Sequence, residues 1–168
     1  KCPVQIVNRP CEVCLNFFSN IVLGVDFSKW CDYAFQFAYH TAKDLNSNLH
    51  IFHCLNIKNL YQDSVNLLPQ DQIEKRVRET EKRIEYQYVS RMKDFRDYEV
   101  RVREGVPFLE LLKYSREKEA NLIILAHHTK EDVPAEEADL GNTVEQIVLR
   151  SAAPVISINH PDKINMEQ

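Results

Sequence analysis

Short apolar runs alternate with longer amphipathic segments along this chain. Residues 21–25 and 122–125 are largely apolar runs, as strands are when a parallel sheet buries both of their faces. Residues 49–57 and 155–158 predict two further strands. In residues 98–104, valine alternates with arginine, which indicates a less buried strand near a sheet edge.

Amphipathic helices are predicted between these strands. Apolar residues recur at spacings of three and four in residues 30–45 and 71–95, so each segment has one face to bury. Pro107 opens a third helix. Asn142 is a good N-cap for a fourth helix, since Glu145 follows it at the spacing of a capping box.

This alternation of strands and helices predicts an α/β domain with an open, mostly parallel five-stranded sheet that is sandwiched by helices, in a Rossmann-like arrangement. Residues 20–160 are expected to form this domain, and residues 161–168 a polar tail. A chain of 168 residues is long enough to bury a proper hydrophobic core.

Composition and charge exclude some classes of protein. The net charge is −4 and no block of lysine or arginine is present, so a nucleic-acid surface is not indicated. No apolar run approaches the ~20 residues of a membrane span. The number of cysteines is odd, at five, which favours a reducing cytoplasm over a disulfide framework.

The most informative stretch, residues 121–158, has the pattern of a strand, a long acidic loop, a helix and a strand. In open α/β sheets, loops after strand ends carry ligands, and helix N-termini favour anions. This stretch resembles the C-terminal third of universal stress proteins, which often carry the ATP-binding pattern G-x2-G-x9-G-[ST] after the fourth strand. Gly141-Asn142 stands where the final pair belongs, but Ala126 and Thr129 replace the earlier glycines, and the spacer is two residues longer.

The resemblance covers residues 19–160 and implies the strand order 3-2-1-4-5, with a switch point between the first and fourth strands. It also implies that Asp26 contacts adenine and that backbone N–H groups at the start of the last helix bind phosphate. The alternative role for the end of the first strand is a helix cap from Asp26 or Ser28. The residues assigned to the cofactor site are Asp26, Cys54, Ala126, His127, Thr129, Gly141, Asn142 and Thr143.

The implied cofactor is ATP or another adenine nucleotide with Mg²⁺, and the alternative is that no cofactor binds. The loop places five acidic residues against Lys130; they are Glu131, Asp132, Glu136, Glu137 and Asp139. Two like charges ~4 Å apart cost about 1 kcal/mol in water and about 4 kcal/mol at a partly buried surface. Helix N-termini offset only ~0.3–1 kcal/mol. We therefore expect nucleotide binding that is weak or altered in geometry.

Three functions remain open on these grounds. The first is a universal stress protein-like module in stress response or signalling, with impaired adenine-nucleotide binding. The second is a module that binds no nucleotide and acts through dimerisation or a partner. The third is a hydrolase that uses His127 or His128 with Asp26. It is disfavoured because neighbouring strand residues point to opposite sides. No catalytic or metal-binding residue is assigned.

The two ends of the chain carry the predictions about assembly. Residues 1–19 form an extension in which residues 4–7 predict a strand, and residues 2–7 (CPVQIV) resemble the last strand of a universal stress protein. The extension is either the end of a preceding tandem copy or a segment that packs on the surface. At the other end, Val155, Ile156 and Ile158 form an apolar edge strand without a charge, which predicts a homodimer through this strand. The alternative is that residues 1–8 cover this edge.

Overall fold

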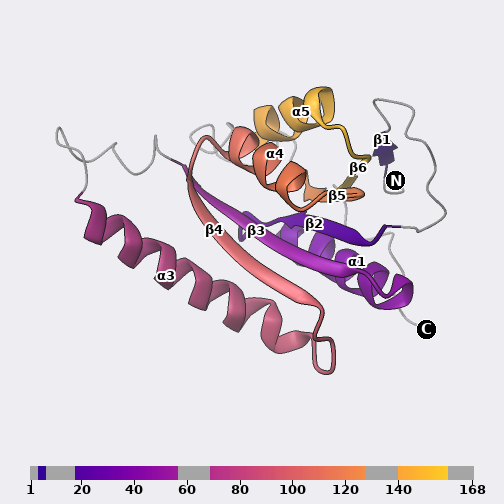
Figure 1. Cartoon of the computed structure of the whole chain (residues 1–168), viewed down its shortest axis with the longest axis horizontal. Coiled ribbons are helices and arrows are strands. Elements are labelled where there is room, and N and C mark those ends of the chain that lie inside the picture. The colour runs from indigo at the N-terminus through magenta and orange to yellow at the C-terminus, as the bar shows by residue number, and fades with distance from the viewer. Residues whose placement is uncertain (1–3, 7–17, 57–68, 128–139, 159–168) are drawn as a thin grey trace.

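The computed structural model describes residues 4–6, 18–56, 69–127 and 140–158 of the chain (Figure 1). None of the helices in these ranges is both long and apolar enough to cross a membrane. In chain order the elements are β1 (Val4–Ile6), β2 (Asn20–Gly24), α1 (Lys29–Leu45), β3 (Asn48–Asn56), α3 (Gln70–Gln87), the 3-10 helix η1 (Val89–Arg91), β4 (Tyr98–Gly105), α4 (Pro107–Glu117), β5 (Leu122–Ala126), α5 (Leu140–Arg150) and β6 (Val155–Ile158).

The strands form one sheet in the order β1-β6-β5-β2-β3-β4. The five strands from β2 to β6 all pair in parallel. Numbered from β2 onward, their order is 3-2-1-4-5, so the predicted strand order and open α/β architecture are confirmed. The alternation in β4 also indicated its place correctly, because β4 lies at one edge of the sheet.

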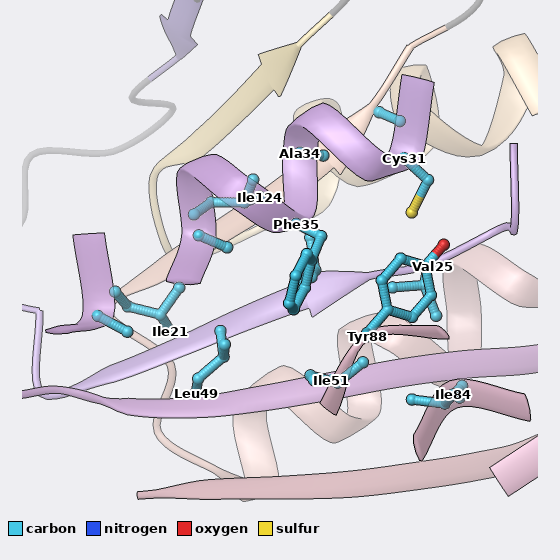
Figure 2. Packing of buried hydrophobic residues seen from close by; sticks show 14 of the residues in the cluster. Ile21, Val25, Cys31, Ala34, Phe35, Leu49, Ile51, Ile84, Tyr88 and Ile124 are labelled. Atoms are coloured by element: carbon cyan, nitrogen blue, oxygen red, sulfur yellow. The ribbon is translucent and has the colours of Figure 1, made fainter. Parts of the chain in front are cut away.

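Helices cover both faces of the sheet (Figure 1). The core on one face joins α1, the end of α3 and the sheet, and the core on the other face joins α4 and α5 to the sheet. Ile21, Val22 and Leu23 of the central strand β2 are 0% exposed, which explains why this run contains no polar residue. In Figure 2, Phe35 of α1 lies against the sheet beside Tyr88; the ring centroids of the two residues are 5.0 Å apart.

Polar residues at the two ends of α1 fix its length. The Ser28 hydroxyl accepts a hydrogen bond from the N–H of Cys31 at 3.2 Å and so forms the N-cap. Asn46 ends the helix in the left-handed conformation, with φ of 51°, which asparagine adopts more readily than most residues. Of the two caps that the sequence offered for α1, Ser28 is therefore the one that is used.

Two helix boundaries differ from the sequence prediction. The helix predicted for residues 71–95 ends at Gln87 and continues as η1, so that Tyr88 and Met92 both enter the core. The apolar spacing in this region suits a long α-helix and a tightened end equally well. Helix α5 begins at Leu140, so Asn142 lies in its first turn and the predicted capping box is wrong. A cap contributes only about 0.5–2 kcal/mol, so other contacts can set where a helix starts.

The predicted N-terminal strand is present and pairs with the last strand. Val4, Gln5 and Ile6 of β1 lie antiparallel to β6. Strand β6 is consequently not an open edge in this chain, which corrects the expectation of an exposed final strand. The edge is covered from within the chain, as the alternative interpretation had it.

We expect Phe35→Ala to lower the free energy of unfolding by about 3–5 kcal/mol, as is typical when a buried aromatic ring is removed. Phe35 is 1% exposed and contacts both Tyr39 and Tyr88. Tyr86→Ala is the matched control, because the Tyr86 ring is 85% exposed, and it should change stability by less than about 0.5 kcal/mol. Urea denaturation measures both; equal losses would contradict this description of the core.

Candidate functional site

The candidate site lies at the carboxyl edge of the parallel strands, between β2 and β5. These neighbours pair directly, with Gly24 opposite Leu125, but the helices that follow them pack on opposite faces of the sheet. Such a switch point is where open α/β sheets usually bind ligands. Because α5 connects the parallel strands β5 and β6, it runs back against them, and its N-terminus lies at this same edge.

Asp26 follows β2 directly and is held by a local turn. One carboxylate oxygen, Oδ1, accepts a hydrogen bond from the N–H of Ser28 at 3.0 Å, an arrangement in which an aspartate mimics a backbone turn. Ser28 in turn caps α1. Asp26 thus supports the start of α1 and also lies half-buried at the switch point. Its structural role at the helix start is therefore compatible with a place in the candidate site.

Phe27 is a site residue that the sequence pattern did not reveal. Its backbone is left-handed, with φ of 63°, a conformation that costs roughly 1–3 kcal/mol for such a residue. Its ring lies 4.8 Å from the His53 ring and 6.2 Å from the Tyr88 ring, between centroids. The Arg83 guanidinium of α3 lies 4.0 Å from the centre of the same ring. This cation–π contact brings a positive charge to the switch point.

His53 is fixed to the backbone of β2. Its Nδ1 lies 2.7 Å from the carbonyl oxygen of Val25, so this nitrogen carries the proton and donates it. Burial lowers the pKa of His53, although the contact with Val25 and the charge of Asp26 oppose that effect. His53 is therefore neutral near pH 7. His50, three residues earlier, packs on the other face against Tyr114, so the two imidazoles lie on opposite sides of β3.

Cys54 lies on the opposite side of β3 from His53 and packs against the core beside α4. Burial raises the pKa of its thiol to about 12, and the charges of Glu110 and Glu104 add to this shift. Cys31, in the first turn of α1, is also a buried thiol, and its side chain points toward Tyr88 (Figure 2). Burial, followed by the charge of Asp26, raises its pKa to about 12. Neither thiol is a reactive nucleophile near neutral pH.

The remaining predicted site residues lie on β5 and α5. Ala126 ends β5 and is 8% exposed. His127 is half-buried, and its backbone N–H donates to the carbonyl of Ile158 at 2.9 Å. Gly141 and Asn142 lie in the first turn of α5, followed by the half-buried Thr143. Thr129 and the acidic loop fall outside the described residues.

The starts of two helices bring partial positive charge to this edge, beside the half-buried carboxylate of Asp26. Two helices, α1 and α5, begin there, and each N-terminus carries a partial positive charge. Within the described ranges, no group of three His, Cys, Asp or Glu side chains is placed to hold a metal ion. A separate open depression of about 550 Å³ lies between α3 and β4, lined by Ile73, Val102, Glu104 and other residues. Its strand, β4, is separated from β2 by β3 in the sheet, and we assign no function to it.

The parallel sheet and its switch point place this chain in the class of α/β proteins with a Rossmann-like architecture. The chain belongs to the universal stress protein family, whose model matches residues 18–159. A comparison with curated proteins gives no match.

Several solved structures share this fold. A universal stress protein from Archaeoglobus fulgidus is 24% identical, with a TM-score of 0.60; the match covers 95% of this chain and 50% of that one. UspA from Lactobacillus plantarum is 23% identical, with a TM-score of 0.63, and 84% and 97% of the two chains are covered. A universal stress protein in complex with cAMP is 22% identical, with a TM-score of 0.55 and coverage of 84% and 97%. This chain thus spans half the length of the Archaeoglobus protein.

We expect the folded protein to lose stability as the pH falls below 6.5, in part because of His53. Burial holds the pKa of His53 below its ordinary value of 6.5, so the unfolded chain binds the proton more tightly. Unfolding then takes up a proton below pH 6.5, and acid favours the unfolded state. Urea denaturation at pH 7.5 and 5.5 measures the loss, which His53→Asn should reduce.

The control is His40→Asn, on the exposed side of α1, which should keep the wild-type pH dependence. NMR titration of the His53 ring provides a direct measurement. A pKa at or above 6.5 would contradict the buried, neutral imidazole.

Proposed function

We propose that this chain is a cytoplasmic universal stress protein module in stress response or signalling, which binds an adenine nucleotide weakly or in altered geometry. The observation that carries the proposal is the juxtaposition at the switch point. Asp26 follows β2, and the first turn of α5, with Gly141, begins at the same edge of the sheet. The family resemblance assigns two parts to nucleotide binding. One is an aspartate that contacts the adenine base, and the other is a glycine at a helix N-terminus that binds phosphate.

Weak binding follows from the residues that replace the first two glycines of the motif. Glycine allows a backbone to approach a phosphate closely, because it has no Cβ. Ala126 is buried at the end of β5, and Thr129 adds a larger side chain three residues later. The segment between β5 and α5 also carries the five acidic side chains and one lysine. The strand and the helix that flank it, β5 and α5, meet the switch-point edge, so we expect its charge to oppose a phosphate there.

These charges favour a nucleotide with few negative charges. A triphosphate is repelled by the acidic segment more strongly than a monophosphate, because each additional charge within a few ångströms costs about 1–4 kcal/mol. The solved universal stress protein with cAMP carries a nucleotide with a single phosphate charge. We therefore propose AMP or cAMP as a better ligand than ATP, and Mg²⁺ as a requirement for ATP alone.

The alternative function is association without a nucleotide. The observation in its favour is that the β6 edge accepts a partner strand, because β1 pairs there within this chain. A homodimer through Val155, Ile156 and Ile158 would then require β1 to leave that edge. Nucleotide titration separates the two functions, since a pure association module shows no heat of binding and no thermal shift with any adenine nucleotide.

Calorimetric titration should give dissociation constants for Mg-ATP weaker than about 100 μM and tighter binding of AMP or cAMP, for the electrostatic reason above. Asp26→Ala should remove most of the affinity for each nucleotide. Asp44→Ala, an exposed position near the end of α1, is the control and should bind as the wild type does. Low-micromolar binding of ATP would refute the impaired site.

Restoring the two glycines should strengthen binding. We expect Ala126→Gly with Thr129→Gly to bind ATP at least about tenfold more tightly, or about 1.4 kcal/mol, because the backbone can then approach the phosphates. Ala120→Gly with Thr41→Gly, substitutions of the same residue types away from the switch point, is the matched control and should leave the affinity unchanged. Unchanged affinity in the restored variant would show that these glycines do not limit binding.

A further inference from the structure

Strand β1 runs against the direction of the other strands. The five strands β2 to β6 are mutually parallel, and β1 alone among the described strands is antiparallel to its neighbour. Its partner pairs are Val4 with Ser157, Gln5 with Ile156, and Ile6 with Val155. An antiparallel strand at the edge of a parallel sheet does not continue the βαβ pattern, so its origin needs a separate explanation.

The pairing has the register of a two-fold axis. Residues 3–6 (PVQI) align with residues 154–157 (PVIS) on their shared Pro-Val. In this alignment Gln5 corresponds to Ile156, and these two residues are paired in the sheet. Val4, which corresponds to Val155, pairs with Ser157, and Ile6, which corresponds to Ser157, pairs with Val155. In a two-fold pair of identical strands, the residue at the axis meets its own copy and its neighbours exchange partners. A slip of one residue would destroy this relation.

The match to the longer structure includes part of the chain that precedes the family match. The Archaeoglobus protein covers 95% of this chain and is matched over 50% of its own length. The uncovered 5% of 168 residues is about 8 residues, fewer than the 17 that precede the family match at residue 18. The match must therefore include at least some of the residues before residue 18. The L. plantarum structure, matched over 97% of its length, covers only 84% of this chain.

We propose that β1 is the last strand of a second universal stress protein module, which precedes this one in the same polypeptide, and that the β6 edge is the surface on which that module docks. The sheets of the two modules are then continuous across the pseudo-two-fold axis between Gln5 and Ile156. The docking surface accepts one kind of partner, the last strand of a module like this one. The proposal is independent of nucleotide binding.

The register is tested first, in the full chain with Cys2, Cys11 and Cys14 replaced by serine. Directly opposite residues in an antiparallel pair have Cα atoms about 4.5–5.5 Å apart, within the range of a disulfide. Gln5→Cys with Ile156→Cys should therefore form an intramolecular disulfide on mild oxidation, as peptide mapping detects. Gln5→Cys with Ser157→Cys, one position out of register, should not. A disulfide in the second variant alone would overturn the two-fold register.

The docking surface is tested by releasing β1 from β6 in the full chain. Neighbouring strand residues direct their N–H groups to opposite edges, so Val4→Pro with Gln5→Pro removes a donor to β6 whichever residue supplies it. We expect the wild type to sediment as a monomer and this variant as a dimer at tens of micromolar. In the variant, Ile156→Cys should cross-link to its own copy, because the two-fold axis passes through that position. A monomeric variant, or a dimer without this cross-link, would overturn the docking surface.

The tandem arrangement is tested by the length of the native polypeptide. An antibody raised against this chain should detect, in the cells of origin, a polypeptide of about twice its length. A native polypeptide of the length of this chain would overturn the preceding module. Neither result depends on whether ATP or AMP binds, so failure of this proposal is distinguishable from failure of the proposed nucleotide site.

Discussion

The parallel pairing of β2 between β3 and β5 is the constraint on which the structure depends. A strand in this place has no face toward water, and Ile21, Val22 and Leu23 are completely buried. Helices must then cover both faces of the sheet, and they do so through two separate cores. The chain changes from one face to the other between β2 and β5. This change of face creates the switch point, so the topology of the sheet alone is sufficient to form it.

The chemistry at the switch point depends on a helix that is distant in sequence. Arg83 and Tyr88 come from the end of α3 and contact the ring of Phe27 directly after β2. These contacts hold Phe27 in its strained backbone conformation, and the same ring packs on the imidazole of His53. The shortened end of α3 therefore serves the site as well as the core, since it turns Tyr88 inward.

Most of the fold could be predicted from the sequence, because its signals are local. Continuous apolar runs marked the buried strands, and the Val/Arg alternation marked β4 as an edge. The family resemblance supplied the strand order, which local patterns do not contain. Contacts between distant segments were not predictable: Arg83 belongs to the charged face of α3, and nothing in its spacing links it to Phe27. The start of α5 at Leu140 was missed because a favourable cap at Asn142 is a weak preference. The pairing of residues 4–6 was foreseen as one of two alternatives, and the structure selected the strand against β6.

The two edges of the sheet differ in what they can accept. Along β4, Glu99 pairs with Arg101 and Lys118, and Arg103 pairs with Glu117; an incoming strand would have to displace or bury these charges. The edge at β6 is short and apolar and takes up β1. Among the described strands, the sheet takes up an added strand on its β6 side and none on its β4 side. Two modules joined through the β6 edge, as proposed, would turn both of their charged β4 edges outward, so that such an assembly would end at two modules and would not grow into a fibre.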